Sequence, residues 1–65
     1  MNPKREIFVE FVVRKNAVKA TAIDSVTGEE ASIIGPLRAG RDALAQAAIR
    51  KLEYVITKKA GIAGS

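Results

Sequence analysis

One stretch of this chain, residues 41–59, repeats apolar side chains at the spacing of an α-helix. The stripe consists of Ala45, Ala48, Ile49, Leu52, Val55 and Ile56, with Leu44 and Ala60 at its margins. A single amphipathic helix is marginal in water, because most helical stability in proteins comes from packing of the apolar face. The remaining residues must therefore form an apolar surface that covers this stripe.

The residues before the helix indicate three short β-strands, over residues 6–14, 17–24 and 30–34. Asn16 marks a tight turn after the first strand and Gly28 a turn after the second, because both residue types tolerate a positive φ. One face of the first strand carries an apolar side chain at every second position: Ile7, Val9, Phe11 and Val13. Three such strands do not hold together alone, so the sheet needs the helix as much as the helix needs the sheet.

We therefore predict an α+β fold, in which a three-stranded antiparallel β-meander is followed by one C-terminal α-helix packed on one sheet face. The element order is β-β-β-α and the architecture has two layers. Residues 1–65 form one small domain, since a chain of this length supports a single core. We expect the ordered core over about residues 5–61, with frayed termini and with Gly61 capping the helix.

The chain contains no Cys and no His. It therefore lacks disulfides, thiolate metal ligands and the usual general base near neutral pH. The adjacent carboxylates Glu29 and Glu30 point to opposite faces of a strand, so they do not form a convergent pair. We predict that the protein is not an enzyme and has no catalytic residue, metal site, cofactor or evident small-molecule substrate.

Residues 33–44, IIGPLRAGRDAL, contain two glycines at the spacing of a phosphate-binding loop, Gly35 and Gly40. Such a loop continues with Lys and then Ser or Thr. Here Arg41 and Asp42 take those places, and a carboxylate at the second place would repel phosphate. The parallel α/β core that surrounds this motif does not fit into so short a chain. We predict instead a crossover from the third strand to the helix, with Gly40 as the helix N-cap.

The sheet face away from the helix would carry four large apolar side chains: Phe8, Val12, Ile23 and Ile34. So much apolar surface on the solvent side of a small domain requires a cover. Self-association is also the remaining way to stabilise the fold of a small chain that has no disulfides or metal ligands. One interpretation is a homodimer or docking interface. The alternatives are shielding by twist and termini, apolar residues scattered singly, or one strand in the inverted register.

The net charge of +4 suits an anionic partner. In a meander the first hairpin and the end of the third strand lie at the same pole. Four cationic side chains would lie at that pole and contact an anion: Arg14, Lys15, Arg38 and Arg41. The outer helix face adds a second set: Arg50, Lys51 and Tyr54. An aromatic ring between cations can stack on a base, so nucleic acid is the alternative partner.

Residues Met1–Arg5 are polar, and no apolar signal core follows them. The longest uncharged apolar run is far shorter than the roughly 20 residues that a membrane-spanning helix needs. The lack of Cys fits a reducing compartment. We therefore expect a cytoplasmic protein with no membrane partner.

The run REIFVEF…VKATAID…TGEEASIIGP…IRKLEYVI…KKAG resembles a family of small bacterial proteins of unknown function, found in alphaproteobacteria. The resemblance covers residues 5–61 and implies a freestanding single-domain protein. It transfers no functional residues, because no activity is assigned to the family.

The β-β-β-α order is also similar to that of integrase amino-terminal domains and of a class of plant DNA-binding domains. Those domains read the major groove with the open sheet face. Here that face would offer Phe8, Val12 and Ile34, with only Arg14 and Lys19 as cations. This fold-level similarity therefore does not favour DNA binding.

These observations favour a small, basic, non-enzymatic binding module that acts through protein–protein contacts on the open sheet face. It would form a homodimer or dock to a protein partner. The alternative is a nucleic-acid-binding protein that uses the basic pole and the basic helix face.

Overall fold

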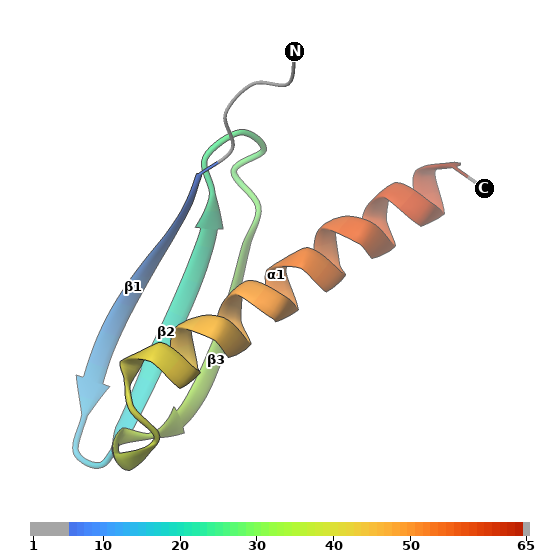
Figure 1. Ribbon diagram of the computed structural model, residues 1–65. Coiled ribbons are helices and arrows are strands. Elements are labelled where there is room, and N and C mark those ends of the chain that lie inside the picture. Colours follow the sequence, from blue (N-terminus) through green and yellow to red (C-terminus); the bar gives the residue numbers. More distant parts are fainter. Residues whose placement is uncertain (1–5, 65) are drawn as a thin grey trace.

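The computed structural model in Figure 1 describes the backbone of residues 6–64 and the side chains of residues 6–59. The elements in chain order are β1 (Ile7–Arg14), β2 (Ala17–Asp24), β3 (Glu30–Pro36), a short 3-10 helix (Leu37–Ala39) and α1 (Arg41–Gly64). The strands form one antiparallel sheet in the order β1-β2-β3, and α1 lies on one of its faces (Figure 1). The predicted α+β fold, a β-meander followed by a C-terminal helix, is confirmed.

The helix is longer than predicted, because it continues through Gly61 to Gly64. A glycine inside a helix costs about 1 kcal/mol relative to alanine, which does not by itself end the helix. The predicted fraying falls on residues 1–4 and 62–65. Of these, only the helical backbone of residues 62–64 lies within the described part of the chain.

The strand pairing confirms which side chains share a face of the sheet. Phe11 pairs with Ala20, and Ala20 pairs with Ile33, so all three lie on the side of α1. Val12 and Ile34 both pair with Lys19 and lie on the opposite side. The inverted register, one of the alternatives for the open face, is therefore excluded.

The core lies between the sheet and α1, and its buried apolar side chains are Val18, Ala20, Ala22, Ala31, Leu44, Ala48 and Leu52. The buried helix positions are four residues apart, so they form one row along α1. Opposite this row, β2 carries alanine at two alternate buried positions. Methyl groups fill little space between the layers, and the helix can therefore lie close to the middle strand.

Two side chains differ from the predicted packing. Leu44, expected at the margin of the helix stripe, is buried in the core. Val13, expected beneath the helix, is 50% exposed. The reason is the position of α1, which packs mainly on β3 and β2 and has little contact with β1. The end of β1 therefore has little cover on its helix side.

The loop between β3 and α1 is a crossover, as predicted. Gly40 has a φ of 89°, and its carbonyl accepts the first helical hydrogen bond from the Leu44 N–H at 3.2 Å. Gly40 is therefore the helix N-cap. Asp42 follows in the first turn, where the helix dipole favours a carboxylate.

A hydrogen bond connects the turn between β1 and β2 to the crossover that precedes α1. Lys15 has a φ of 53°, and it is the only described residue other than glycine with a positive φ. The expectation that Asn16 takes this conformation is therefore wrong. The Asn16 carbonyl instead accepts a hydrogen bond from the Leu37 N–H at 2.8 Å. The hairpin tip and the crossover thus meet at one pole, as the meander requires.

Gly35 of β3 lies directly against Leu44 of α1, so that a Cβ at this position would collide with the leucine side chain. We expect Gly35→Ala to lower the free energy of unfolding by about 1–3 kcal/mol, the usual cost of overpacking a core. Urea denaturation followed by circular dichroism measures this loss. The Leu44→Ala background removes the colliding atoms, and Gly35→Ala should cost less there. An equal cost in both backgrounds would contradict this packing.

Asp24 is fully buried and organises the turn between β2 and β3. Its Oδ1 accepts hydrogen bonds from the N–H groups of Val26 at 2.8 Å and Thr27 at 3.1 Å. We expect Asp24→Ala to lower the free energy of unfolding by about 1–3 kcal/mol, because two backbone N–H groups of the turn lose their buried acceptor. Asp24→Asn keeps one acceptor oxygen and should cost less in the same denaturation experiment. If both variants lost stability equally, these two bonds would not be what stabilises the turn.

Candidate protein-interaction surface

The sheet face away from α1, here called the open face, carries the four predicted interface residues in two groups. Phe8 pairs with Ile23 toward one end of the sheet, whereas Val12 and Ile34 flank Lys19 toward the other. Ile34 is 74% exposed, Phe8 and Val12 are half exposed, and Ile23 is partly buried. Within the described residues nothing covers Phe8, Val12 or Ile34. The open face therefore presents apolar side chains at both of its ends.

A polar row crosses the three strands between these two groups. It consists of Glu10, Thr21 and Ser32, which are successive partners in the sheet. The hydroxyls of Thr21 and Ser32 lie 2.8 Å apart and form a hydrogen bond. This bond uses one of the two hydroxyl hydrogens, so a protein that covers the row must still pair the second hydroxyl hydrogen and the Glu10 carboxylate.

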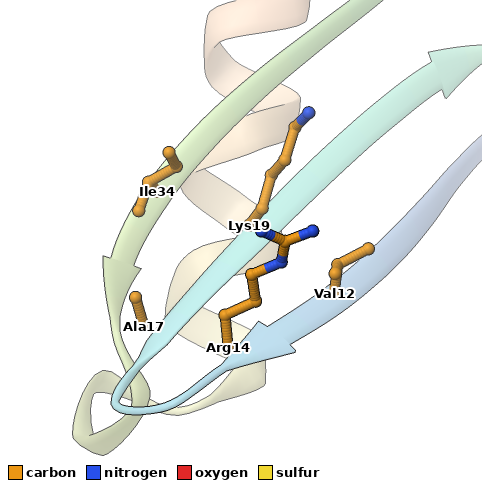
Figure 2. Close-up of a pocket in the computed structure, with 5 residues that line it drawn as sticks. All are labelled: Val12, Arg14, Ala17, Lys19 and Ile34. Carbon is orange, nitrogen blue, oxygen red and sulfur yellow. The ribbon is translucent and has the colours of Figure 1, made fainter.

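Figure 2 shows a hollow at the Val12 end of the open face. Its lining residues are Val12, Arg14, Ala17, Lys19 and Ile34. Arg14 from β1 and Lys19 from β2 extend along the face, with Val12 to one side and Ile34 to the other. No carboxylate lines the hollow. It therefore combines apolar walls with two positive charges, which suits an apolar group that lies next to an acidic one.

The four cations of the predicted basic pole are directed to different sides of the molecule. Arg14 lies on the open face, and Arg38 lines a second hollow beside the 3-10 helix. The guanidinium of Arg41 lies 5.6 Å from the centroid of the Phe11 ring, on the helix side of the sheet. Lys15 is exposed at the hairpin turn. The fold thus brings the backbone segments of these residues together, while their side chains spread over the pole.

The three predicted contact residues on α1 also differ in their surroundings. Arg50 and Tyr54 are exposed, and the Lys58 Nζ lies 5.6 Å from the centroid of the Tyr54 ring. Lys51 instead reaches the sheet, where its Nζ donates a hydrogen bond to the Ser32 carbonyl at 2.8 Å. The outer helix face therefore keeps Arg50 and Tyr54 accessible, whereas Lys51 is engaged at the edge of β3.

Two features of this surface do not follow from the sequence pattern. A lysine on the polar side of a helix gives no signal that it reaches a strand carbonyl, because that contact depends on where the helix lies over the sheet. The exposure of Val13 has the same cause. Apolar residues on both faces of β1 could have indicated it, since Val12 and Val13 are adjacent in the sequence.

Two other kinds of site find no support in the described part of the chain. Between residues 6 and 59, no group of three acidic side chains comes close enough together to hold a metal ion. No helix of the described residues has both the length and the apolar character that crossing a membrane requires. The open face and its hollow are therefore the candidate functional features.

An open three-stranded meander with one helix on one face defines this protein as a small two-layer α+β domain. The chain belongs to the family DUF6898, a domain of unknown function, whose model matches residues 4–59. No curated protein and no solved structure matches the chain. The predicted membership of an unknown-function family is confirmed, and its bacterial origin stays a prediction. The function must accordingly be inferred from the surface of the domain.

Proposed function

We propose that this protein is a non-enzymatic binding module that acts through protein contacts on the open face. The contact would form with the same face of a second copy or with a docked protein partner. The observation that carries this proposal is the exposure of Phe8, Val12 and Ile34 on the side of the sheet that α1 does not cover. Burying apolar surface stabilises a complex by roughly 25 cal/mol per Å² before the costs of association.

The chemistry of the open face supports a specific contact. Its apolar groups occupy both ends, and a polar row that includes a hydrogen bond between Thr21 and Ser32 lies between them. Arg14 and Lys19 add positive charge near Val12 and Ile34. A partner of this face would therefore need apolar side chains near both ends and a carboxylate near the hollow, which gives the contact a defined orientation.

The non-enzymatic part of the proposal rests on the groups that are present. The hollow offers aliphatic side chains and the two basic side chains Arg14 and Lys19, and no hydroxyl, thiol, imidazole or carboxylate lines it. Such a set can bind and orient an anionic or apolar group, but it supplies no obvious proton transfer or covalent step.

Nucleic-acid binding is the second candidate, and the observation that favours it is the pair Arg14 and Lys19 in a hollow without a lining carboxylate. The helix-face cations contribute less than the sequence implies, since Lys51 is engaged with Ser32. Arg41 lies over the Phe11 ring. This surface would therefore contact only a few phosphates of a bound nucleic acid.

The proposed open-face contact can be tested in its homodimeric form with Ile34→Asp. Ile34 is the most exposed large apolar residue of the face, so a carboxylate there should abolish face-to-face association without unfolding the domain. Sedimentation equilibrium at micromolar concentration measures the association, and circular dichroism verifies the fold. Val26→Asp, at an exposed apolar residue of the β2–β3 turn, is the matched control and should leave association unchanged. If Ile34→Asp weakened no step of the association, face-to-face packing would be excluded.

The nucleic-acid alternative predicts binding that weakens steeply with salt, with a log–log slope of about −0.9 for each phosphate contacted on duplex DNA. Replacing Arg14 with alanine should reduce that slope by about one contact. A filter-binding titration over a range of salt concentrations measures both quantities. No retention of duplex or single-stranded probes at low salt would end this alternative.

A further inference from the structure

The outer edge of β1 has no partner strand among the described residues. The Ser25 N–H donates a hydrogen bond to the Glu6 carbonyl at 2.9 Å. The even-numbered residues of β1 therefore direct their N–H and C=O groups toward β2. Because these directions alternate along an antiparallel strand, Val9, Phe11 and Val13 direct their N–H and C=O groups away from the sheet. No hydrogen bond between described residues engages these outward groups.

The outer edge of β3 is protected, in contrast. The outward carbonyl of Ser32 accepts a hydrogen bond from the Lys51 Nζ at 2.8 Å. Pro36, at the end of the same strand, has no N–H to offer. Lysine and proline are common means by which proteins prevent a sheet edge from pairing with another chain. The domain thus blocks one of its two edges and leaves the other open.

The open edge is also the most apolar strand of the sheet. Its sequence is IFVEFVVR, with Glu10 and Arg14 as its only charged residues. At the hairpin end both of its faces are exposed, since Val12 on the open face is 52% exposed and Val13 on the helix side is 50% exposed. A strand laid against this edge would pair the outward backbone groups and cover both side chains at once.

We infer that the occupant of this edge is a second copy of the chain, paired through antiparallel β1 strands. Both copies then contribute the same strand about a two-fold axis, as in most homodimers. With that axis perpendicular to the sheet and through Val12, Glu10 of each copy lies directly opposite Arg14 of the other. The two Val12 side chains meet at the centre, and Phe11 lies opposite the Val13 of the other copy. Opposite charges in directly facing positions stabilise a strand pair.

The pairing of Glu10 with Arg14 favours this register of the β1–β1 pair over the registers centred on Glu10 or Phe11. An axis through Glu10 would place the two Glu10 carboxylates directly opposite each other, which is destabilising. An axis through Phe11 would place Glu10 opposite Val12 and leave the carboxylate without its charge partner. The strand is therefore self-complementary when the paired stretch covers residues 10–14 of each copy. The product is one six-stranded sheet with both helices on the same side.

This inference is independent of the open-face proposal, because it concerns the β1 edge and the backbone groups there. Charge reversal tests it most sharply. Glu10→Arg and Arg14→Glu each place like charges opposite one another, and we expect each to raise the dimer dissociation constant by roughly tenfold or more. The double variant Glu10→Arg/Arg14→Glu restores the opposite-charge pairs and should restore the dimer. Analytical ultracentrifugation of all four proteins measures the constants.

Two further variants distinguish association through the β1 edge from association through the open face. Val13→Pro removes an outward N–H, and proline is tolerated where the N–H side of an edge strand faces solvent. It should abolish the dimer while circular dichroism shows a folded domain. Ile34→Asp, on β3, should leave the edge-paired dimer intact. A wild-type protein that stays monomeric over a wide concentration range would overturn the inference, as would single charge reversals without effect or a double variant that fails to restore association.

Discussion

The structure depends on one contact, the packing of the Leu44, Ala48 and Leu52 row of α1 against the small side chains of the sheet. A three-stranded sheet does not persist without such a cover, and this chain has a single helix to provide it. The helix packs mainly on β3 and β2. The helix consequently leaves one whole sheet face and the outer part of β1 uncovered, and these are the two surfaces to which we propose that a partner binds.

The uncovered surfaces differ in chemistry. The open face would bind through side chains, with apolar groups at its ends, a polar row between them and two cations at a hollow. The β1 edge would bind through its backbone, with a row of outward N–H and C=O groups and two exposed valines at the hairpin end. The two sites are compatible, because a β1–β1 pair would join the open faces of both copies into a single surface. Lys51 at the β3 edge limits such pairing to one side of the sheet.

Much of the fold could be predicted from the sequence, because period-two alternation in Ile7–Val13 and helical spacing after Gly40 leave few other arrangements. The face of each strand was also correctly predicted from this alternation. The exposure of Val13 and the burial of Leu44 could not be predicted, since both depend on how α1 lies over the sheet. The same holds for the cations. Their sequence positions indicate a shared pole, but the contacts of Arg41 with Phe11 and Lys51 with Ser32 depend on side-chain directions.

The central claim is that this domain acts through the part of the sheet that α1 leaves uncovered. Amide chemical shifts of the isotope-labelled protein, recorded over a series of concentrations, test it most directly. We expect concentration-dependent shifts confined to β1 and to open-face positions such as Lys19 and Ile34, with the outer face of α1 unchanged. Shifts centred on Arg50 and Tyr54, or no change over the whole series, would contradict self-association through the sheet.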